Sequence, residues 1–253
     1  MQRIYILLCI FLLSFSSNAQ DPLYHTNNPL PCVHKTFQVY VFIVLDSLGR
    51  PVLDNQTLDL HMQELNQAFE PVCITFEVCK TTLIEDYYYE TIEDTLEVNV
   101  MTSRFQKKRR INIYFSKSVL DDEENSFSRY NSIRDTRGAV LVIPANGRGL
   151  VHEMGHTFGL RHIFETKFGR ETVDGKNCRT AGDFICDTPA APPYSPANQF
   201  CEFYSDQKDS NGQFYKAEIG NYMSHHFCAH CFFTKEQYLR MAENYLNSPF
   251  KMW

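Results

Sequence analysis

The sequence lacks an apolar run long enough for a membrane span, since none of its hydrophobic stretches reaches the ~18 residues that suggest one. It also lacks an excess of positive charge. With 24 basic and 30 acidic residues, its formal net charge is -6, which gives no support for nucleic-acid binding. No internal repeat is visible. We therefore expect neither a membrane span nor a nucleic-acid partner.

The composition is that of a globular protein. Of the 253 residues, 43% are hydrophobic and 21% are charged, which is close to the averages for folded soluble chains. This balance excludes a mainly disordered chain and a collagen-like one. Nine cysteines are a high count for a cytosolic protein of this length.

Residues 1–19 have the features of a secretory signal peptide. Arg3 supplies a positive charge, residues 4–15 are mostly apolar, and Ser17 and Ala19 fit a cleavage site before residue 20. This apolar stretch is too short for a membrane anchor. Its removal takes away Cys9 and leaves an even number of cysteines, which favours disulfides in an exported chain. We predict a secreted protein, either extracellular or periplasmic.

Apolar segments organise the first half of the chain. Four of them have the composition of strands: residues 36–45, 73–78, 111–115 and 139–143. Between the first two, Asp54 is the expected N-cap and Pro71 the expected end of a helix. Its apolar residues recur at helical spacing: Leu58, Met62, Leu65 and Phe69. The acidic, tyrosine-rich residues 82–99 are expected to be a solvated excursion.

The second half has a different character. Residues 167–220 are rich in Gly, Pro, Asn, Asp and Cys and show little periodicity, so they need cross-links or a metal to hold a shape. A last helix is predicted from about Lys235 to Leu246. Thr234 and Gln237 have the spacing of a capping box at its start.

The segment with the clearest chemistry is HEMGHTFGLRH, residues 152–162. On a helix, His152 and His156 share one face and can both direct an imidazole at one metal ion. Glu153 lies beside them, where it can take a proton from a water on the metal. Gly159 allows the left-handed turn that would bring His162 round as a third ligand. Three histidines and an open position describe a catalytic zinc site.

Two other interpretations of this segment remain. A surface helix with two histidines is the plain alternative, and the glycine and third histidine at fixed spacing count against it. Other zinc peptidases use a downstream glutamate as third ligand. Glu165 and Glu171 are the candidates here, although His162 already fits.

These residues resemble the long zinc signature of the metzincin metallopeptidases. Within that clan the chain is similar to the pappalysin family, specifically its small secreted bacterial members, over about residues 36–246. The segment Gly182-Asp183-Phe184-Ile185-Cys186-Asp187-Thr188-Pro189 narrows the resemblance to the family. Further segments match in order and spacing: Ile163-Phe164-Glu165, Asn177-Cys178, Asn221-Tyr222-Met223-Ser224 and Phe233-Thr234-Lys235-Glu236-Gln237.

The resemblance implies an α+β, metzincin-like zincin fold. It has a mixed twisted sheet, an active-site helix and an irregular, disulfide-linked C-terminal subdomain. After the signal peptide, residues 20–253 would form a single catalytic domain, with an upper subdomain at about 34–160 and a lower one at about 161–253. The strand at 139–143 would be the edge strand over the cleft, where extended substrate adds by backbone hydrogen bonds.

The resemblance also implies a role for each site residue. His152, His156 and His162 would bind zinc, and Glu153 would act as general base and then as general acid. Met223 would be the Met-turn residue, which packs beneath the zinc and is not a ligand.

One position departs from the family. His225 stands where relatives usually have a tyrosine that helps to stabilise the tetrahedral intermediate, so we assign it a catalytic role as hydrogen-bond donor. A fourth zinc ligand or a surface histidine are its alternatives. Relatives that prefer basic residues use an acidic residue just past the Met-turn. No Asp or Glu lies between Met223 and Lys235, so a basic preference is not supported.

The cysteines can be sorted in part. Cys73 and Cys79 are ~20 Å apart in an extended strand, too far for a disulfide between them. Cys32 has two possible roles, a disulfide with another loop or a small cysteine switch on the zinc. The family places disulfides around the Met-turn, which implies that Cys201 pairs with Cys228 or Cys231.

Calcium remains an open possibility, since relatives bind it in the second half. The acidic loop at 121–125 and the residues at 206–212 are the candidate positions. Plain loops and turns explain both without an ion, because the EF-hand spacing is incomplete.

The leading hypothesis is a secreted zinc endopeptidase with a peptide or protein substrate. A non-catalytic secreted zinc-binding protein that retains the metzincin fold is the alternative, and a zinc hydrolase of non-peptide amides is the third. The sequence does not determine the physiological substrate or the oligomeric state.

Overall fold

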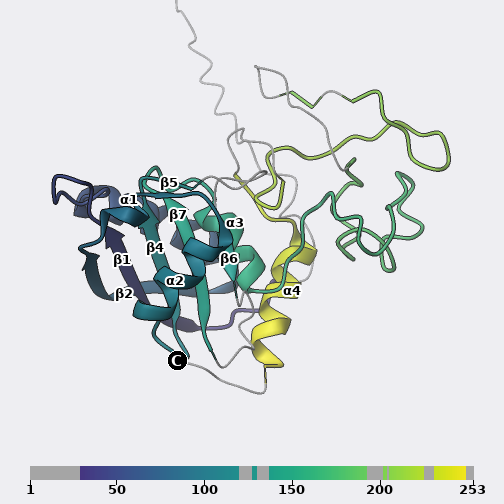
Figure 1. Cartoon of the computed structure of the whole chain (residues 1–253). Coiled ribbons are helices and arrows are strands. Elements are labelled where there is room, and N and C mark those ends of the chain that lie inside the picture. The colour runs from purple at the N-terminus through teal and green to yellow at the C-terminus, as the bar shows by residue number, and fades with distance from the viewer. Residues whose placement is uncertain are drawn as a thin grey trace, which may run out of the picture.

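The computed structural model describes residues 29–119, 127–129, 137–192, 202–203, 205–224 and 231–248. Its centre is a five-stranded sheet with the order β2-β1-β4-β7-β6 (Figure 1). Four strands run parallel, and β6 is antiparallel to β7. The strands are β1 (Lys35–Val44), β2 (Ile74–Ile84), β4 (Ile111–Ser116), β6 (Phe127–Arg129) and β7 (Ala139–Pro144).

The central strands are apolar because both of their faces are covered. All six residues of β4 and all six of β7 are buried. Successive side chains point to opposite faces, so Ile113 and Leu141 join one apolar cluster while Tyr114 and Val142 join another. Continuous apolar runs of this kind are typical of parallel sheets with cover on both sides.

Three helices cover one face of the sheet, and a fourth contributes to the other. The larger cluster contains apolar side chains of α1 (Asn55–Phe69), α3 (Leu150–Thr157) and α4 (Lys235–Leu246). Val98 and Met101 of α2 (Thr95–Phe105) belong to the smaller cluster. Two short strands, β3 (Thr91–Ile92) and β5 (Ser118–Val119), pair beside it.

The helix termini follow the sequence signals. Asp54 caps α1 by accepting a hydrogen bond from the backbone N–H of Thr57. At α4, Thr234 and Gln237 form both bonds of the expected capping box. The two helices therefore begin where short polar side chains satisfy the first free backbone donors.

Two expectations about the sheet are wrong. Residues 82–99 are not a solvated excursion, since they complete β2, form β3 and start α2. Tyr89, Ile92 and Val98 are buried there because the second face of the sheet needs an apolar cover. The strand at 139–143 is not at the edge either: β7 lies between β4 and β6, so β6 is the edge strand on that side.

The chain after α3 contains little regular structure. Figure 1 shows the green and yellow-green trace running away from the sheet before it returns to α4. From residue 163 to residue 224, the described residues form turns and isolated bridges and contain no helix or strand. In the described part of the chain, no helix has the length and apolar character that crossing a membrane requires.

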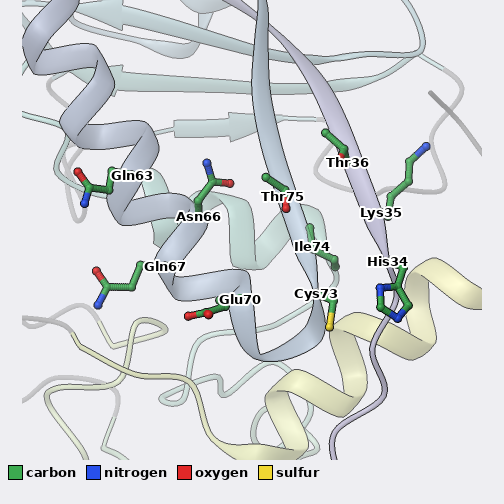
Figure 2. A pocket seen from close by; sticks show the side chains of 10 residues that line it. All are labelled: His34, Lys35, Thr36, Gln63, Asn66, Gln67, Glu70, Cys73, Ile74 and Thr75. Carbon is green, nitrogen blue, oxygen red and sulfur yellow. The ribbon is translucent and has the colours of Figure 1, made fainter.

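A cavity of about 940 Å³ lies between α1 and the first residues of β1 and β2 (Figure 2). Its wall includes the polar side chains of Gln63, Gln67 and Glu70 from the helix side and the apolar side chain of Ile74 from β2. Asn66 is bonded to the backbone of Phe76 through both ends of its amide, which ties α1 to β2. None of the histidines of the zinc signature lines this cavity.

Candidate metal centre

Helix α3 brings two histidines of the signature together. The helix begins after Gly149, directly beyond the turn that follows β7, and contacts β6 and β7. His152 is buried, while His156, one turn later, is partly exposed. The i, i+4 spacing places their imidazoles on one side of the helix, with ring centroids 4.7 Å apart.

A tight turn at Gly159 brings the third histidine into the same place. Gly159 has φ +89°, and a Cβ atom on it would lie 2.1 Å from the Asn244 side-chain nitrogen of α4. That nitrogen donates a 2.8 Å hydrogen bond to the Phe158 carbonyl at the end of α3. Only glycine meets both demands, and the turn sets the His162 ring 4.5 Å from that of His156.

The three imidazoles converge through their Nε2 atoms. These atoms are 3.1 Å apart between His152 and His156, 2.9 Å between His156 and His162, and 3.1 Å between His152 and His162. Tetrahedral zinc with nitrogen ligands at about 2.0–2.1 Å separates them by ~3.3 Å. The spacing of the three nitrogens therefore suits one small cation.

Backbone carbonyls fix the protonation of two of these rings. His152 Nδ1 lies 2.7 Å from the Tyr222 carbonyl oxygen, and His156 Nδ1 lies 2.9 Å from that of Leu160. Because a carbonyl only accepts, each Nδ1 must carry a proton, and each neutral ring then directs a lone pair from Nε2. Facing lone pairs repel unless a cation lies between them. The residues present therefore fit a metal, and the three histidines are a group that could hold one.

Glu153 follows the first histidine on α3 and is 2% exposed. Its backbone N–H bonds to Gly149 and its carbonyl accepts from Thr157, so its main chain is fixed within the helix. The structure thus places the predicted acid–base residue beside His152 in a largely dry environment.

Neither alternative third ligand joins the cluster. The Glu165 carboxylate accepts a hydrogen bond from the Lys167 backbone. Glu171 is buried, and its Oε2 has no hydrogen-bond partner among the described residues. Burial, and then the neighbouring Asp183, raise the pKa of Glu171 to about 8.

Met223 lies directly beneath α3. It is fully buried, and a Cβ atom on Gly155 would lie 2.6 Å from its sulfur, so the glycine lets the thioether approach the helix. The Met223 carbonyl accepts a hydrogen bond from the backbone N–H of Ile163, the residue after the third histidine. The turn that holds Met223 is therefore attached to both ends of the histidine segment.

His162 sits between aromatic neighbours. Its ring stacks on Phe164 at 4.6 Å with 7° between the planes. The adjacent Arg161 guanidinium lies 4.1 Å and 4.2 Å from the ring centroids of Phe168 and Phe184. Burial lowers the pKa of Arg161, and these ring faces are favourable cation–π partners. The sequence analysis missed this contact, because Phe184 is distant in sequence.

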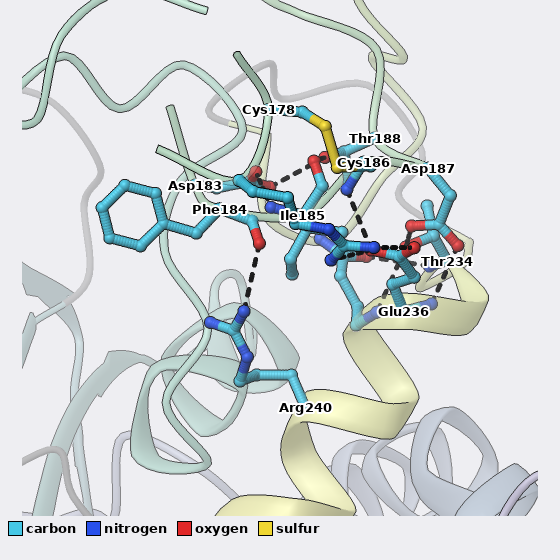
Figure 3. Close-up of polar contacts among 12 residues, drawn as sticks. Cys178, Asp183, Phe184, Ile185, Cys186, Asp187, Thr188, Thr234, Glu236 and Arg240 are labelled. Carbon is cyan, nitrogen blue, oxygen red and sulfur yellow. Dashed lines mark hydrogen bonds and ion pairs between the residues drawn. A yellow bond between two sulfur atoms is a disulfide. The ribbon is translucent and has the colours of Figure 1, made fainter. Parts of the chain in front are cut away.

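A polar network ties the irregular stretch to the start of α4 (Figure 3). Asp187 accepts hydrogen bonds from the Thr234 hydroxyl at 2.6 Å and from the Glu236 backbone at 2.8 Å. The Glu236 carboxylate accepts from the Cys186 backbone and from both terminal nitrogens of Arg179. Hydrogen bonds to side chains therefore connect the irregular stretch to α4, whereas backbone hydrogen bonds connect the strands of the sheet.

Asp183 turns inward within the same stretch. Its carboxylate accepts from the Ile185 backbone at 2.9 Å and from the Thr188 hydroxyl at 2.9 Å. Burial raises the pKa of Asp183 to about 6, although these bonds and Arg240 oppose the shift. The segment that pointed to one family within the clan therefore forms a turn around the buried Asp183.

The disulfides agree in part with expectation. Cys32 pairs with Cys73, so Cys73 is not bonded to Cys79, and Cys178 pairs with Cys186. Cys79 and Cys231 are free thiols, which leaves no Cys201–Cys231 bond. Cys201 and Cys228 lie outside the described residues.

His225 and residues 121–125 also lie outside the described residues. At the other candidate calcium position, Asp209 accepts hydrogen bonds from the backbones of Val173, Asn211 and Gln213. This bonding accounts for Asp209 as a turn residue. The described residues at 205–212 contain no group of three His, Cys, Asp or Glu side chains close enough to share a metal.

Comparison with known proteins finds a family model that matches the part of the chain with this geometry. Residues 141–246 match the peptidase M43 family, described as pregnancy-associated plasma protein-A. No curated protein matches the sequence. The match contains the histidine segment, the turn around Asp183 and the capping box of α4. It confirms the resemblance to the pappalysin family that these segments carry.

Comparison with solved structures identifies one with a similar fold. A structure of mirolysin in complex with a compound shares 20% sequence identity with this chain, with a TM-score of 0.56. The similarity covers 82% of this chain and 90% of that chain. Metalloproteinase-II from Bacteroides fragilis has 9% identity and a TM-score of 0.43, covering 89% of this chain and 58% of that one. The mirolysin likeness confirms the predicted α+β fold class with its mixed sheet and active-site helix.

Proposed function

Because residues 141–246 carry a pappalysin-type metallopeptidase domain, we propose that this protein is a secreted zinc endopeptidase. The observation that carries the proposal is the convergence of three Nε2 atoms within 3.1 Å of one another. Two of these rings are held by carbonyls in the tautomer that a metal requires. His152, His156 and His162 would hold the zinc.

The chain's own acid–base group is Glu153. Zinc at three imidazoles lowers the pKa of a bound water to ~7 and polarises the substrate carbonyl. Glu153 would take the proton from the attacking water and then deliver it to the leaving amine, so one carboxylate serves both halves of the reaction. Glu153 is buried and follows His152 in sequence, which supports this role because the carboxylate would be shielded from bulk water.

Substrate would bind along β6. Among the described strands β6 ends the sheet next to the active-site helix, since it pairs with β7 on one side and contacts α3. An extended peptide can add to such an edge through backbone hydrogen bonds. This assignment replaces the earlier expectation for the strand at 139–143.

Several finer assignments complete the proposal. His225 would donate a hydrogen bond to the developing oxyanion. Residues 1–19 would be removed during export, and residues 20–253 would form one catalytic domain with subdomains at about 34–160 and 161–253. N-terminal sequencing of protein exported from a bacterial host tests the cleavage, with Gln20 as the expected first residue.

Glu153→Gln is the decisive variant. It should keep about one zinc per chain and the wild-type unfolding transition, while peptide hydrolysis falls by about 10²–10⁴-fold because the general base is lost. Cleavage of a peptide library by the purified mature chain, with zinc measured by elemental analysis, provides both readouts.

Two companion variants make the test specific. Glu165→Gln changes a carboxylate near the third histidine that bonds to the Lys167 backbone, and it should leave zinc and activity unchanged. His156→Ala should lose zinc and activity together. Full zinc in His156→Ala would refute the ligand set. A zinc-loaded wild type that cleaves no library peptide would favour the non-catalytic alternative.

A further inference from the structure

Two fully buried amides face each other between the Met-turn and α4. Asn221 Nδ2 donates a 2.8 Å hydrogen bond to Gln237 Oε1, and Gln237 Nε2 donates a 3.1 Å bond back to Asn221 Oδ1. Both residues are 0% exposed. A reciprocal pair of this kind holds both side chains in one orientation, since each amide donates and accepts.

The Gln237 side of the pair is anchored to α4. Gln237 Oε1 also accepts a 2.8 Å bond from the Thr234 backbone, as the capping box requires. The Thr234 hydroxyl bonds in turn to Asp187, an exposed residue of the irregular stretch. The position of the Gln237 amide is therefore set by a helix terminus and not by the metal centre.

The Asn221 side reaches the metal centre through one peptide group. Asn221 Oδ1 accepts a 2.8 Å hydrogen bond from the Met223 backbone N–H. The carbonyl of that same peptide unit belongs to Tyr222, and it accepts the 2.7 Å bond from His152 Nδ1. Since a peptide unit is planar and rigid, fixing its N–H fixes the direction of its carbonyl.

We propose that Asn221 and Gln237 are positioning residues for the metal centre, acting through the Tyr222–Met223 peptide on the His152 ring. The pair fixes the orientation of that peptide plane, and the Tyr222 carbonyl in the plane fixes the position of His152 Nδ1. The orientation of the ring then sets the direction of the Nε2 lone pair. The inference rests on the proposed function, because it takes His152 as a zinc ligand. Hydrogen-bond partners of metal-bound histidines set ring orientation and ligand basicity.

Asn221→Ala is the first test, because it removes the bond to the peptide N–H. The dissociation constant for Zn²⁺, measured by competition with a chelating dye, should rise about 10- to 100-fold. The visible absorption spectrum of the Co²⁺-loaded chain should shift, since it reports ligand geometry. Neither readout depends on peptidase activity.

A matched control separates positioning from stability. Asn112 is also 0% exposed, and it bonds to the backbones of Lys107, Arg110 and Ala139 at the start of β4. These hydrogen bonds do not reach the Met-turn or α3. Asn112→Ala should lower the unfolding midpoint as Asn221→Ala does, while the Zn²⁺ constant and the Co²⁺ spectrum stay as in the wild type.

Two substitutions at Gln237 should weaken Zn²⁺ binding to different degrees. Gln237→Met keeps a similar volume, removes every polar bond of the pair, and should weaken Zn²⁺ binding in the same direction as Asn221→Ala. Gln237→Glu keeps the two acceptor bonds of Oε1 and should restore much of the affinity. Because Gln237→Met leaves Asn221 in place, it provides a test even if Asn221→Ala does not fold.

The outcomes are distinct. The proposal is overturned if Asn221→Ala or Gln237→Met, folded at the assay temperature, binds Zn²⁺ with the wild-type constant and gives the wild-type Co²⁺ spectrum. The pair would then be structural only. A wild type that binds Zn²⁺ but hydrolyses no peptide refutes the peptidase proposal alone, since the metal readouts still decide the positioning role.

Discussion

The sheet and the chain that follows the third histidine are held together by different forces. In the sheet, every residue of β4 and β7 is buried, and the rings of Phe37, Phe76 and Phe158 pack against one another. From residue 163 to residue 224, the described residues give the larger apolar cluster only four buried members, Ile163, Ile185, Tyr222 and Met223, and a disulfide and side-chain bonds to backbone add to them. Apolar packing tolerates small shifts, whereas directional hydrogen bonds specify the position of a particular group, as a metal centre requires.

The largest effect on stability should come from a cavity in the sheet region. Phe37 is fully buried and makes ring contacts with Phe76, Phe158 and Tyr245. Phe37→Ala should reduce the free energy of unfolding by about 3–5 kcal/mol, measured by urea denaturation. Leu48→Ala at an exposed turn is the control and should change little. A loss below ~1 kcal/mol for Phe37→Ala would contradict a packing-based sheet region.

The irregular stretch should respond to loss of its cross-link. The Cys178–Cys186 disulfide closes a short loop, with a sequence separation of 8. Replacing both cysteines by serine should cost about 2–3 kcal/mol from the loop-closure entropy of the unfolded chain.

The effect of that double variant should be local. Limited proteolysis should show that cleavage within residues 167–192 speeds up more than cleavage within the sheet, because the cross-link constrains only that stretch in the native state. If cleavage within the sheet speeds up to the same degree, the two regions unfold as one unit. The sheet and the irregular stretch would then differ in structure but not in their stability.

The difference between the regions also explains what the sequence could predict. Helical spacing and β-branched runs located α1, α4 and the strands, because burial leaves a period in the sequence. The edge position of β6 was missed, since a strand of three residues has no period to detect. The cover formed by residues 82–99 was missed because Tyr89 and Ile92 are separated by polar residues.

Some features of the candidate site could likewise be predicted from the sequence, and others could not. The histidine spacing and the left-handed turn at Gly159 were predictable, because short-range geometry decides them. The carbonyls of Leu160 and Tyr222 that orient the rings could not be predicted, because every residue has a backbone carbonyl and the residue type does not mark its role. The Asn221–Gln237 pair joins residues from separate segments, so only the folded chain brings them together.

A pH experiment examines the buried carboxylates of the irregular stretch. Burial raises the pKa of Glu171 to about 8, above its value of ~4.3 in the unfolded chain. The folded state therefore binds this proton more tightly, and its stabilising effect is complete below ~pH 4.3 and is lost as the pH rises through about 8. Wild-type stability should decline over this interval.

Glu171→Gln removes that titration. Relative to the wild type, the variant should gain stability as the pH rises above the unfolded-state pKa of ~4.3, and the gain should level off above about pH 8. Thermal unfolding at several pH values measures the difference, with Glu165→Gln as a control that should run parallel to the wild type. A constant difference between Glu171→Gln and the wild type at all pH values would show that folding does not shift the pKa of Glu171.

The smallest effect should come from the exposed ion pair at the start of α4. Arg179 bonds to both oxygens of Glu236 at 2.7 Å, but its side chain is 63% exposed. Water and salt screen such pairs, so Arg179→Ala should cost only about 0.5 kcal/mol, and less at high salt. Asp187→Ala is the informative comparison, because it removes the bonds to Thr234 and to the Glu236 backbone that cap the helix, worth ~1 kcal/mol or more. Equal losses for the two variants in urea denaturation would mean that charge, and not hydrogen bonds to the helix terminus, holds the irregular stretch to α4.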